Sequence, residues 1–103
     1  MGFRVSYTKQ ATDDLAGIIS YIRDELSNPE AAEHFYKSVK EKLELLCEHP
    51  YMFPLYHNDK LSAQGFRFIV AGSFLIFYLV DDDSSVVNIV RILYGKQDVV
   101  GKI

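Results

Sequence analysis

Apolar residues recur at helical spacing through most of the first half of the chain. A short alternating stretch, Phe3–Tyr7, precedes them and predicts a first strand. Thr8 is suited to cap a first helix, and Asn28 followed by Pro29 is suited to begin a second. The two apolar stripes are Ala11, Leu15, Ile18, Ile19, Ile22 and Leu26, and then Ala32, Phe35, Tyr36, Val39, Leu43, Leu46 and Cys47. Because the connection between them is short, we expect an antiparallel helical hairpin.

The charged residues of the second helix fall opposite its apolar stripe. Glu33 and Lys37 are four residues apart. Lys40 and Glu44 have the same spacing. Residues at this spacing are neighbours on a helix surface, so we expect two ion pairs on a solvated face, each worth about 0.2–0.5 kcal/mol.

The stretch HPYMFPLYHNDKLSAQG, residues 49–65, has no apolar periodicity and predicts an irregular segment. Loops of this length are unusual in a compact domain and are often functional. We expect its aromatic residues to pin it to the core, namely Tyr51, Phe53 and Tyr56. His49 and His57 have no carboxylate or cysteine at metal-ligand spacing, so no metal site is expected.

Three apolar runs fill most of the second half: Phe66–Val70, Ser73–Val80 and Val86–Tyr94. Ala71-Gly72 and Asp81–Ser85 separate them and predict turns, which makes the runs an antiparallel meander. The middle run, SFLIFYLV, lacks polar alternation and predicts a central strand that is buried on both faces.

Two arginines, Arg67 and Arg91, lie inside these predicted strands. Strand alternation predicts that Arg91 shares one face of the last strand with Val87, Ile89 and Leu93, while the other face carries Asn88, Val90 and Ile92. The element order predicts an α+β fold: an N-terminal strand, an antiparallel two-helix hairpin and a three-stranded antiparallel meander. Residues 1–103 are expected to form a single domain.

The composition is that of an ordinary soluble globular domain, with 49% hydrophobic and 24% charged residues. The start, MGFRVSYTKQ, does not have the pattern of a signal peptide, and no apolar run is long enough to span a bilayer. The single cysteine, Cys47, is expected to be a small buried hydrophobe and suits a reducing cytoplasm.

The net charge argues against a protein that binds RNA tightly. The net charge is −3, and residues 49–103 hold five Lys/Arg against five Asp/Glu. Residues 1–48 hold six against nine, so the acidity lies in the first half. Proteins that bind RNA or the ribosome usually carry a basic face, because phosphate neutralisation supplies much of their affinity.

The pieces GFRFIVAGSFLIFYLVD and VVNIVRILYGKQDV, in this element order, resemble the RelE/ParE superfamily of small toxins from bacterial type II toxin–antitoxin modules. The resemblance covers essentially the whole chain. It rests on Arg67 at the start of the first meander strand and on I-x-R-I-L-x-G from Ile89 to Gly95. It also rests on the pattern G-x-x-x-I-x-Y-x-V, formed by Gly72, Ile76, Tyr78 and Val80.

The resemblance implies one of two activities. One branch of the superfamily, the RelE-like branch, cleaves messenger RNA in the ribosomal A site without a metal, using basic residues on the sheet and a tyrosine or histidine near the C-terminus. The ParE-like branch inhibits DNA gyrase and lacks that cleavage set. Both are neutralised by an antitoxin whose C-terminal segment wraps around the toxin. The resemblance therefore implies a cognate antitoxin as partner, no cofactor and no metal.

If the chain is an endoribonuclease, its catalytic residues are expected to be Arg67, Arg91 and Tyr94. Guanidinium groups bind phosphate in a bidentate manner and would stabilise the charge that grows on it. Tyr94, with Lys96 beside it, would transfer a proton. A tyrosine pKa starts near 10, so this residue would need help from nearby cations to act as a base.

Structural roles compete with these catalytic ones. Arg67 would lie on an exposed strand face and pair with an acid such as Asp59 or Asp81. Arg91 would stabilise the fold together with Tyr94.

The ending YGKQD, residues 94–98, favours the gyrase branch. Gyrase-directed members commonly show His-Gly-Arg-Arg-Asp or a similar sequence there, and Gly95 and Asp98 match this pattern. Tyr94 replaces the histidine and Gln97 an arginine, so the local basicity is lower. We therefore expect a cytoplasmic, ParE-like toxin of a plasmid-stabilisation module that binds gyrase without chemistry. A RelE-like endoribonuclease acting on the ribosome and its message, and a degenerate module that binds only its antitoxin, are the alternatives.

Overall fold

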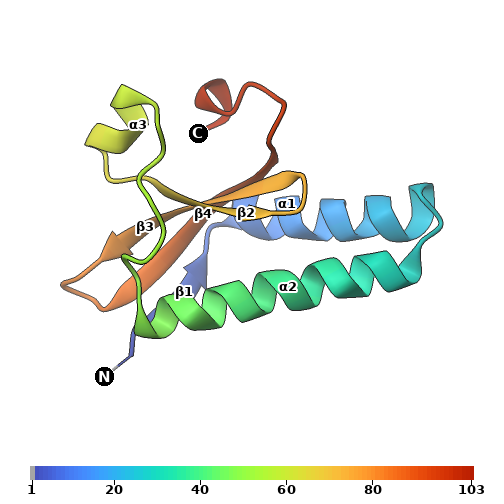
Figure 1. The fold of residues 1–103 in the computed structure, drawn as a ribbon, viewed down its shortest axis with the longest axis horizontal. Coiled ribbons are helices and arrows are strands. Elements are labelled where there is room, and N and C mark those ends of the chain that lie inside the picture. Colours follow the sequence, from blue (N-terminus) through green and yellow to red (C-terminus); the bar gives the residue numbers. More distant parts are fainter. Residues whose placement is uncertain (1) are drawn as a thin grey trace.

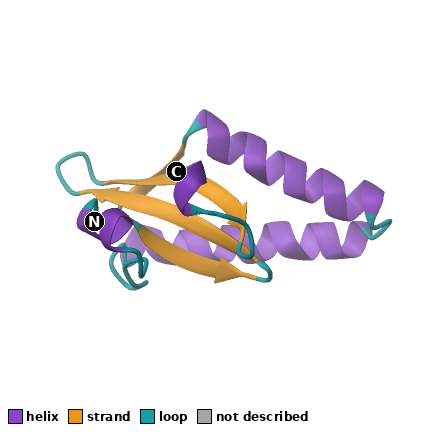
Figure 2. Cartoon of the chain, turned by 90° about the horizontal axis from the view of Figure 1, so that it is seen from above, coloured by secondary structure: helices purple, strands orange, loops and turns teal. Residues whose placement is uncertain are grey.

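A computed structural model describes residues 2–103, in which one sheet lies between a helical hairpin and a smaller layer formed by α3 and the C-terminal segment (Figures 1 and 2). The elements in chain order are β1 Arg4–Tyr7, α1 Lys9–Ser20, a π-helical turn Tyr21–Glu25, α2 Pro29–Glu48, α3 Asp59–Ala63, β2 Arg67–Ala71, β3 Phe74–Asp81, β4 Val86–Tyr94 and a 3-10 turn Val100–Lys102. The α+β order of strand, hairpin and meander is confirmed.

Both predicted helix caps form. The Thr8 hydroxyl accepts a hydrogen bond from Ala11 N at 3.0 Å, and the Asn28 side chain accepts one from Ala31 N at 3.1 Å. The first stripe predicted one helix to Leu26, but α1 ends at Ser20 and continues as the π-helical turn. Single π turns inside helices often mark functional positions.

The strand order is β1-β4-β3-β2, with β1 parallel to β4 and the other pairs antiparallel. The N-terminal strand therefore completes the sheet beside the last strand. The run expected to be central is β3, an inner strand with Ile76 and Phe77 both 0% exposed. Ile76 packs on the helix side and Phe77 on the opposite side, as strand alternation requires.

A bulge in β4 overturns the predicted pattern of faces along that strand. Phe77 pairs with Arg91 and Tyr78 with Ile89, so Val90 is an extra residue between them. The extra residue shifts the alternation. On the helix side the cluster therefore includes Val87, Ile89 and Ile92, while Leu93 packs on the opposite side. The prediction that Val87, Ile89, Arg91 and Leu93 share one face is wrong beyond the bulge.

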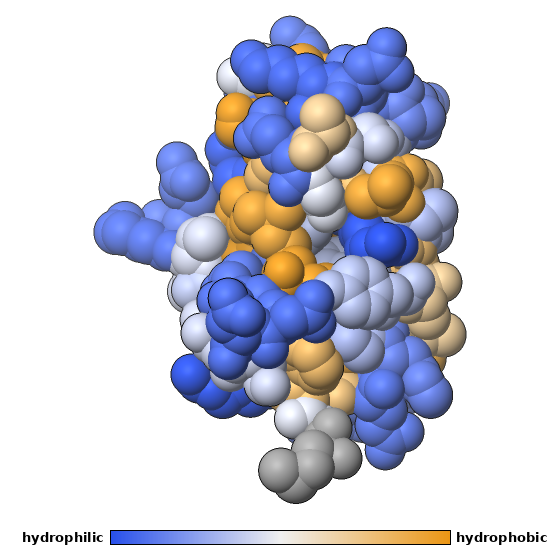
Figure 3. All heavy atoms as spheres, turned by 90° about the vertical axis from the view of Figure 1, so that its left-hand side faces the viewer, coloured by the Kyte–Doolittle hydropathy of each residue, from blue (hydrophilic) through white to orange (hydrophobic). Residues whose placement is uncertain are grey.

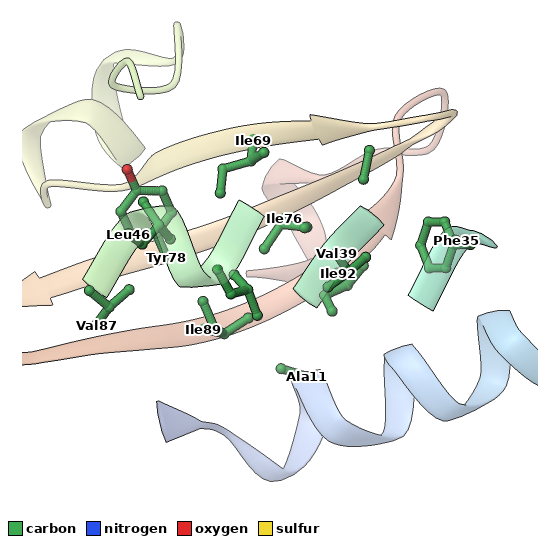
Figure 4. Packing of buried hydrophobic residues seen from close by; sticks show 12 residues of the cluster. Ala11, Phe35, Val39, Leu46, Ile69, Ile76, Tyr78, Val87, Ile89 and Ile92 are labelled. Atoms are coloured by element: carbon green, nitrogen blue, oxygen red, sulfur yellow. The ribbon is translucent and has the colours of Figure 1, made fainter. Parts of the chain in front are cut away.

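The core has two parts, one on each face of the sheet. The larger part lies under the hairpin, where Val39 and Leu46 meet Ile76, Tyr78 and other sheet residues (Figure 4). The smaller part is covered by α3 and the C-terminal segment, which contribute Leu61, Val99 and Ile103. Burial on both faces explains why β3 has no polar alternation.

The segment expected to be irregular contains α3, capped by the Asn58 side chain. Tyr56 is buried and Phe53 packs against the core, as predicted, whereas Tyr51 is 49% exposed. Cys47 is only partly buried.

The end of the molecule that carries the N-terminus shows apolar residues in a central band and hydrophilic residues around them (Figure 3). Within residues 2–103, no helix combines the length and apolar character that a bilayer span requires. The same residues contain no group of three or more metal-ligating side chains.

Candidate functional site

Arg67 lies at the start of β2 and holds the preceding loop. Its Nη1 donates to Phe53 O at 2.7 Å and to Tyr51 O at 3.4 Å, and its guanidinium carbon lies 4.9 Å from the centre of the Tyr51 ring. Within the described chain it forms no ion pair with Asp59 or Asp81, so the predicted acid partners are wrong. The loop carbonyls take the place of those acids.

Arg91 is held by Asp14 of α1. Its Nε and Nη2 donate to the two carboxylate oxygens at 2.8 and 3.0 Å, and its Nη1 donates to Lys102 O at 2.8 Å. These hydrogen bonds to Asp14 raise the pKa of Arg91, so its guanidinium stays charged. The arginine thus joins α1, β4 and the C-terminal turn, and its bidentate face is already occupied by a carboxylate.

The start of α1 explains why Asp14 lies there. Beyond the end of β1, the backbone groups of β4 that a longer strand would pair are hydrogen-bonded by the cap residue and by a side chain of α1. Thr8 N donates to Ile89 O at 3.0 Å, and the Thr8 hydroxyl donates to Val90 O at 2.7 Å. Asp14 then accepts from Ile92 N at 3.0 Å. The helix therefore continues the hydrogen bonding that a longer β1 would supply.

Tyr94 closes β4 and is 40% exposed. Its ring lies 5.8 Å from that of Phe74, edge to face, and its backbone N–H donates to the Gln97 side chain at 2.9 Å. Within residues 2–103, Tyr94 and Arg91 form no hydrogen bond or cation–π contact with each other, so the predicted pair is wrong. Lys96 is exposed in the turn that follows.

Arg91 and Tyr94 nevertheless line one pocket of about 700 Å³, and Arg67 does not. A second pocket of about 830 Å³ lies between the tip of the helical hairpin and the β2–β3 turn. The two adjoin at Tyr21, Phe74 and Tyr94, which line both, and we call them together the hairpin groove. Its other apolar lining residues include Ile18, Ile22, Leu26 and Phe35.

The sequence did not predict the Asp14–Arg91 pair. A two-helix, one-sheet domain of this size is expected to leave an apolar groove beside the hairpin or at the open sheet edge, and the hairpin groove lies beside the hairpin, but its lining residues were not predicted. Asp14 stands among the polar residues of α1, 77 positions before Arg91, and nothing in its neighbourhood marks it as a partner. Tyr21 and Leu26 carried one signal, because each is a large apolar residue near the tip of a short hairpin. They are 53% and 54% exposed, and Leu26 is so although it matches the apolar stripe of the first helix.

The three candidate cleavage residues do not face one common space in the described chain. Metal-free attack by a 2′-hydroxyl needs a base, an acid and cations that face the phosphate. Arg67 and Arg91 contact different parts of the chain, and Arg91 is paired with a carboxylate. As a binding site the arrangement is better suited, since aromatic and aliphatic side chains line an open groove.

Solved toxin structures share this fold. The chain is similar to a structure of the chromosomal ParDE toxin–antitoxin system from P. aeruginosa, with a TM-score of 0.69 and 19% identity over 89% of this chain and 95% of that one. It is also similar to a mutant of the E. coli toxin RelE in the free state, with a TM-score of 0.65 and 17% identity over 99% and 93% of the two chains. The toxin–antitoxin complex RelBE2 from Mycobacterium tuberculosis is more distant, with a TM-score of 0.52 and 16% identity over 91% and 99%.

These likenesses establish the fold, and a family model establishes the family. No curated protein sequence matches this chain significantly. Residues 5–99 match the family model described as the ParE toxin of the type II toxin–antitoxin system parDE, a match that runs from within β1 to the buried Val99. The chain therefore belongs to the ParE toxin family of type II toxin–antitoxin systems.

Proposed function

We propose that this protein is a growth-inhibiting toxin that acts in the cytoplasm by binding DNA gyrase. The observation that carries this proposal is the engagement of both candidate cleavage arginines. Asp14 occupies the bidentate face of Arg91, and loop carbonyls occupy Arg67. With its bidentate face on Asp14, Arg91 has no such face to offer a scissile phosphate, and Arg67 is tied to the loop through its Nη1, whereas inhibition by binding needs neither guanidinium.

The charge of the molecule supports the same proposal. A net charge of −3 gives little electrostatic attraction toward ribosomal RNA. Membership of the ParE toxin family points in the same direction, because the ParE-like branch is the gyrase-directed one. Within a plasmid-stabilisation module, such a toxin would arrest cells that lose the module.

We further propose that a cognate antitoxin silences the toxin by placing an amphipathic helix in the hairpin groove. The P. aeruginosa and M. tuberculosis structures are described as toxin–antitoxin assemblies, which supports a partner of this kind. The groove exposes Tyr21, Leu26 and Tyr94 on an open surface. A helix with apolar residues on one face would cover these side chains and remove their area from water.

Two assays on one protein preparation test the proposed target. Purified gyrase is incubated with relaxed plasmid, ATP and the toxin, and supercoiling is expected to fall at micromolar or lower toxin. Adding the product of the neighbouring gene should restore it. In parallel, purified ribosomes programmed with a defined message should show no new 5′ ends. Cleavage of the message, abolished by Tyr94→Phe, would overturn the proposal in favour of an endoribonuclease. Loss of both activities in a protein that still binds its antitoxin would identify a degenerate module.

A further inference from the structure

The outer edge of β1 carries backbone groups that no other strand pairs. The N–H groups of Arg4 and Thr8 each donate at 3.0 Å to carbonyl oxygens in or next to β4. Backbone groups alternate in direction along a strand, so those of Val5 and Tyr7 point away from β4. Since β1 lies at the edge of the sheet, no strand within residues 2–103 meets them. An edge of this kind is a template for another strand.

A shallow apolar groove lies beside this edge, between β1 and α2. Its volume is about 210 Å³, and it is lined by Val5, Tyr7, Lys40, Leu43, Glu44 and Cys47. None of these residues lines the hairpin groove. We call this second depression the β1 groove. It offers space for the side chains of an added strand, directly next to the unpaired backbone groups.

Two exposed charges of opposite sign border the β1 groove. Glu33 and Lys37 form the ion pair that their spacing predicts, at 3.2 Å. Lys40 and Glu44 have the same spacing but form no ion pair within the described chain. Both therefore remain available to an external partner, and the partner must present a cation and an anion at matching positions.

A second copy of this chain would place its own Glu44 and Lys40 opposite Lys40 and Glu44 of the first copy. Phe3 N donates to Cys47 O at 2.7 Å, so the C-terminal end of α2 lies at the start of β1. At the other end Tyr7 lines the β1 groove together with Lys40, nearer the start of α2, and burial followed by the charge of Tyr36 raises the pKa of Tyr7. The helix thus runs antiparallel to the strand. A twofold axis across the strand edge would then bring Lys40 of each copy toward Glu44 of the other.

We propose that β1 pairs antiparallel with β1 of a second copy, about a twofold axis at Ser6. In this register Val5 of each copy lies opposite Tyr7 of the other in a hydrogen-bonded pair, which satisfies the outward N–H and C=O groups of both residues. Ser6 faces its own counterpart in a non-hydrogen-bonded pair, with Cα atoms about 4.5 Å apart. The contact is isologous, so it closes at a dimer and leaves both hairpin grooves free.

The first test is the oligomeric state of the intact chain, measured by light scattering and sedimentation over a wide range of micromolar concentrations. The mass should rise from 11.8 kDa toward twice that value. Lys40→Glu and Glu44→Lys should each raise the dimer dissociation constant about tenfold or more, because like charges would meet across the axis. The double variant K40E/E44K should restore it. Lys37→Glu, on the same helix but away from the groove, should leave it unchanged. A chain that stays monomeric throughout would overturn the proposal, as would a double variant without rescue.

A disulfide test checks the register. In a Cys47→Ala background, Ser6→Cys should form a disulfide-linked dimer under mild oxidation, since non-hydrogen-bonded pairs across antiparallel strands bring side chains close. Ser84→Cys, in the exposed β3–β4 turn, is the matched control and should link far less. Equal linking of both variants would indicate random collision and would count against the proposal. Absence of linking by Ser6→Cys in a preparation that is dimeric by mass would overturn the register.

Discussion

The Asp14 carboxylate accepts two hydrogen bonds from the Arg91 guanidinium, one from Nε at 2.8 Å and one from Nη2 at 3.0 Å, although the two residues are 77 positions apart in the sequence. The two side chains are only 16% and 17% exposed. The same carboxylate accepts from Ile92 N, and the same guanidinium donates to Lys102 O. This pair fastens α1 to the part of β4 that β1 does not reach, and it places a carboxylate on the bidentate face of Arg91.

The first prediction concerns the stability that this pair contributes. Asp14→Asn removes the charge that neutralises a mostly buried guanidinium, so the free energy of unfolding should fall by about 1.5–3 kcal/mol. Urea unfolding followed by circular dichroism measures it. Asp13→Asn is the matched control, because Asp13 pairs with Lys9 on the surface, where the two side chains are 65% and 89% exposed. Its loss should be about 0.5 kcal/mol or less. Equal effects of the two substitutions would contradict the assigned role.

The second prediction concerns the loop that precedes β2. Arg67→Ala removes the hydrogen bonds to Phe53 O and Tyr51 O and the contact with the Tyr51 ring. We expect faster proteolytic cleavage within residues 49–58 and a loss of about 1–2 kcal/mol in the free energy of unfolding. Limited proteolysis with mass spectrometry identifies the cut sites. Lys60→Ala, on the exposed side of α3, should change neither quantity. Unchanged proteolysis of the Arg67 variant would show that the loop is held by other contacts.

The sequence predicted the fold to a large extent because its signals are local. Thr8 and Asn28 are caps whose preferred partners lie three residues ahead, and both form those bonds. The continuous apolar run of β3 records burial on both faces, which a single strand carries in its own residues. These features need no knowledge of distant parts of the chain.

The errors concern features that arise between distant segments. The bulge at Val90 depends on how β4 meets β3, and strict alternation along β4 contains no trace of it. The Asp14 partner of Arg91 depends on where α1 starts relative to β4. The candidate site was therefore predicted only in part: Arg91 and Tyr94 do line one groove, but the acid that occupies Arg91 could be found only in three dimensions.

The third prediction concerns alkaline pH. Tyr78 is 0% exposed, and burial raises its pKa from 10.0 to about 12. The unfolded chain releases the phenol proton near pH 10, and the folded chain retains it until about pH 12. This contribution to stability is therefore fully present below pH 10 and is lost as the pH rises toward 12. The loss amounts to about 3 kcal/mol.

Tyr78→Phe isolates this contribution. At pH 7 the variant should be less stable by about 1 kcal/mol, since it lacks the hydrogen bond from the hydroxyl to Pro50 O at 3.0 Å. Above pH 10 the difference should shrink and then reverse, because the variant has no phenol to ionise there. Tyr7 and Tyr51, whose pKa values are also raised, are present in both proteins. Urea unfolding at a series of pH values measures the difference. A constant difference from pH 7 to pH 11.5 would show that Tyr78 ionises equally in both states.

The fourth prediction locates the antitoxin on the hairpin groove. Tyr21 lines both parts of the groove and is 53% exposed, so Tyr21→Asp should leave the fold intact. It places a charge where we expect an apolar helix face, and desolvating that charge should weaken antitoxin binding by about 2 kcal/mol, or roughly 30-fold in Kd. Calorimetry with the product of the neighbouring gene measures this. Leu45→Asp is the matched control, because Leu45 is 45% exposed on α2 and lines none of the described grooves. If Leu45→Asp weakens antitoxin binding and Tyr21→Asp does not, the antitoxin binds the face of α2 that carries Leu45 and not the hairpin groove. The gyrase assay then tells whether the antitoxin and gyrase bind the same surface of the toxin. A Tyr21 variant that still inhibits gyrase but is no longer neutralised by the antitoxin would show that the two partners bind different surfaces.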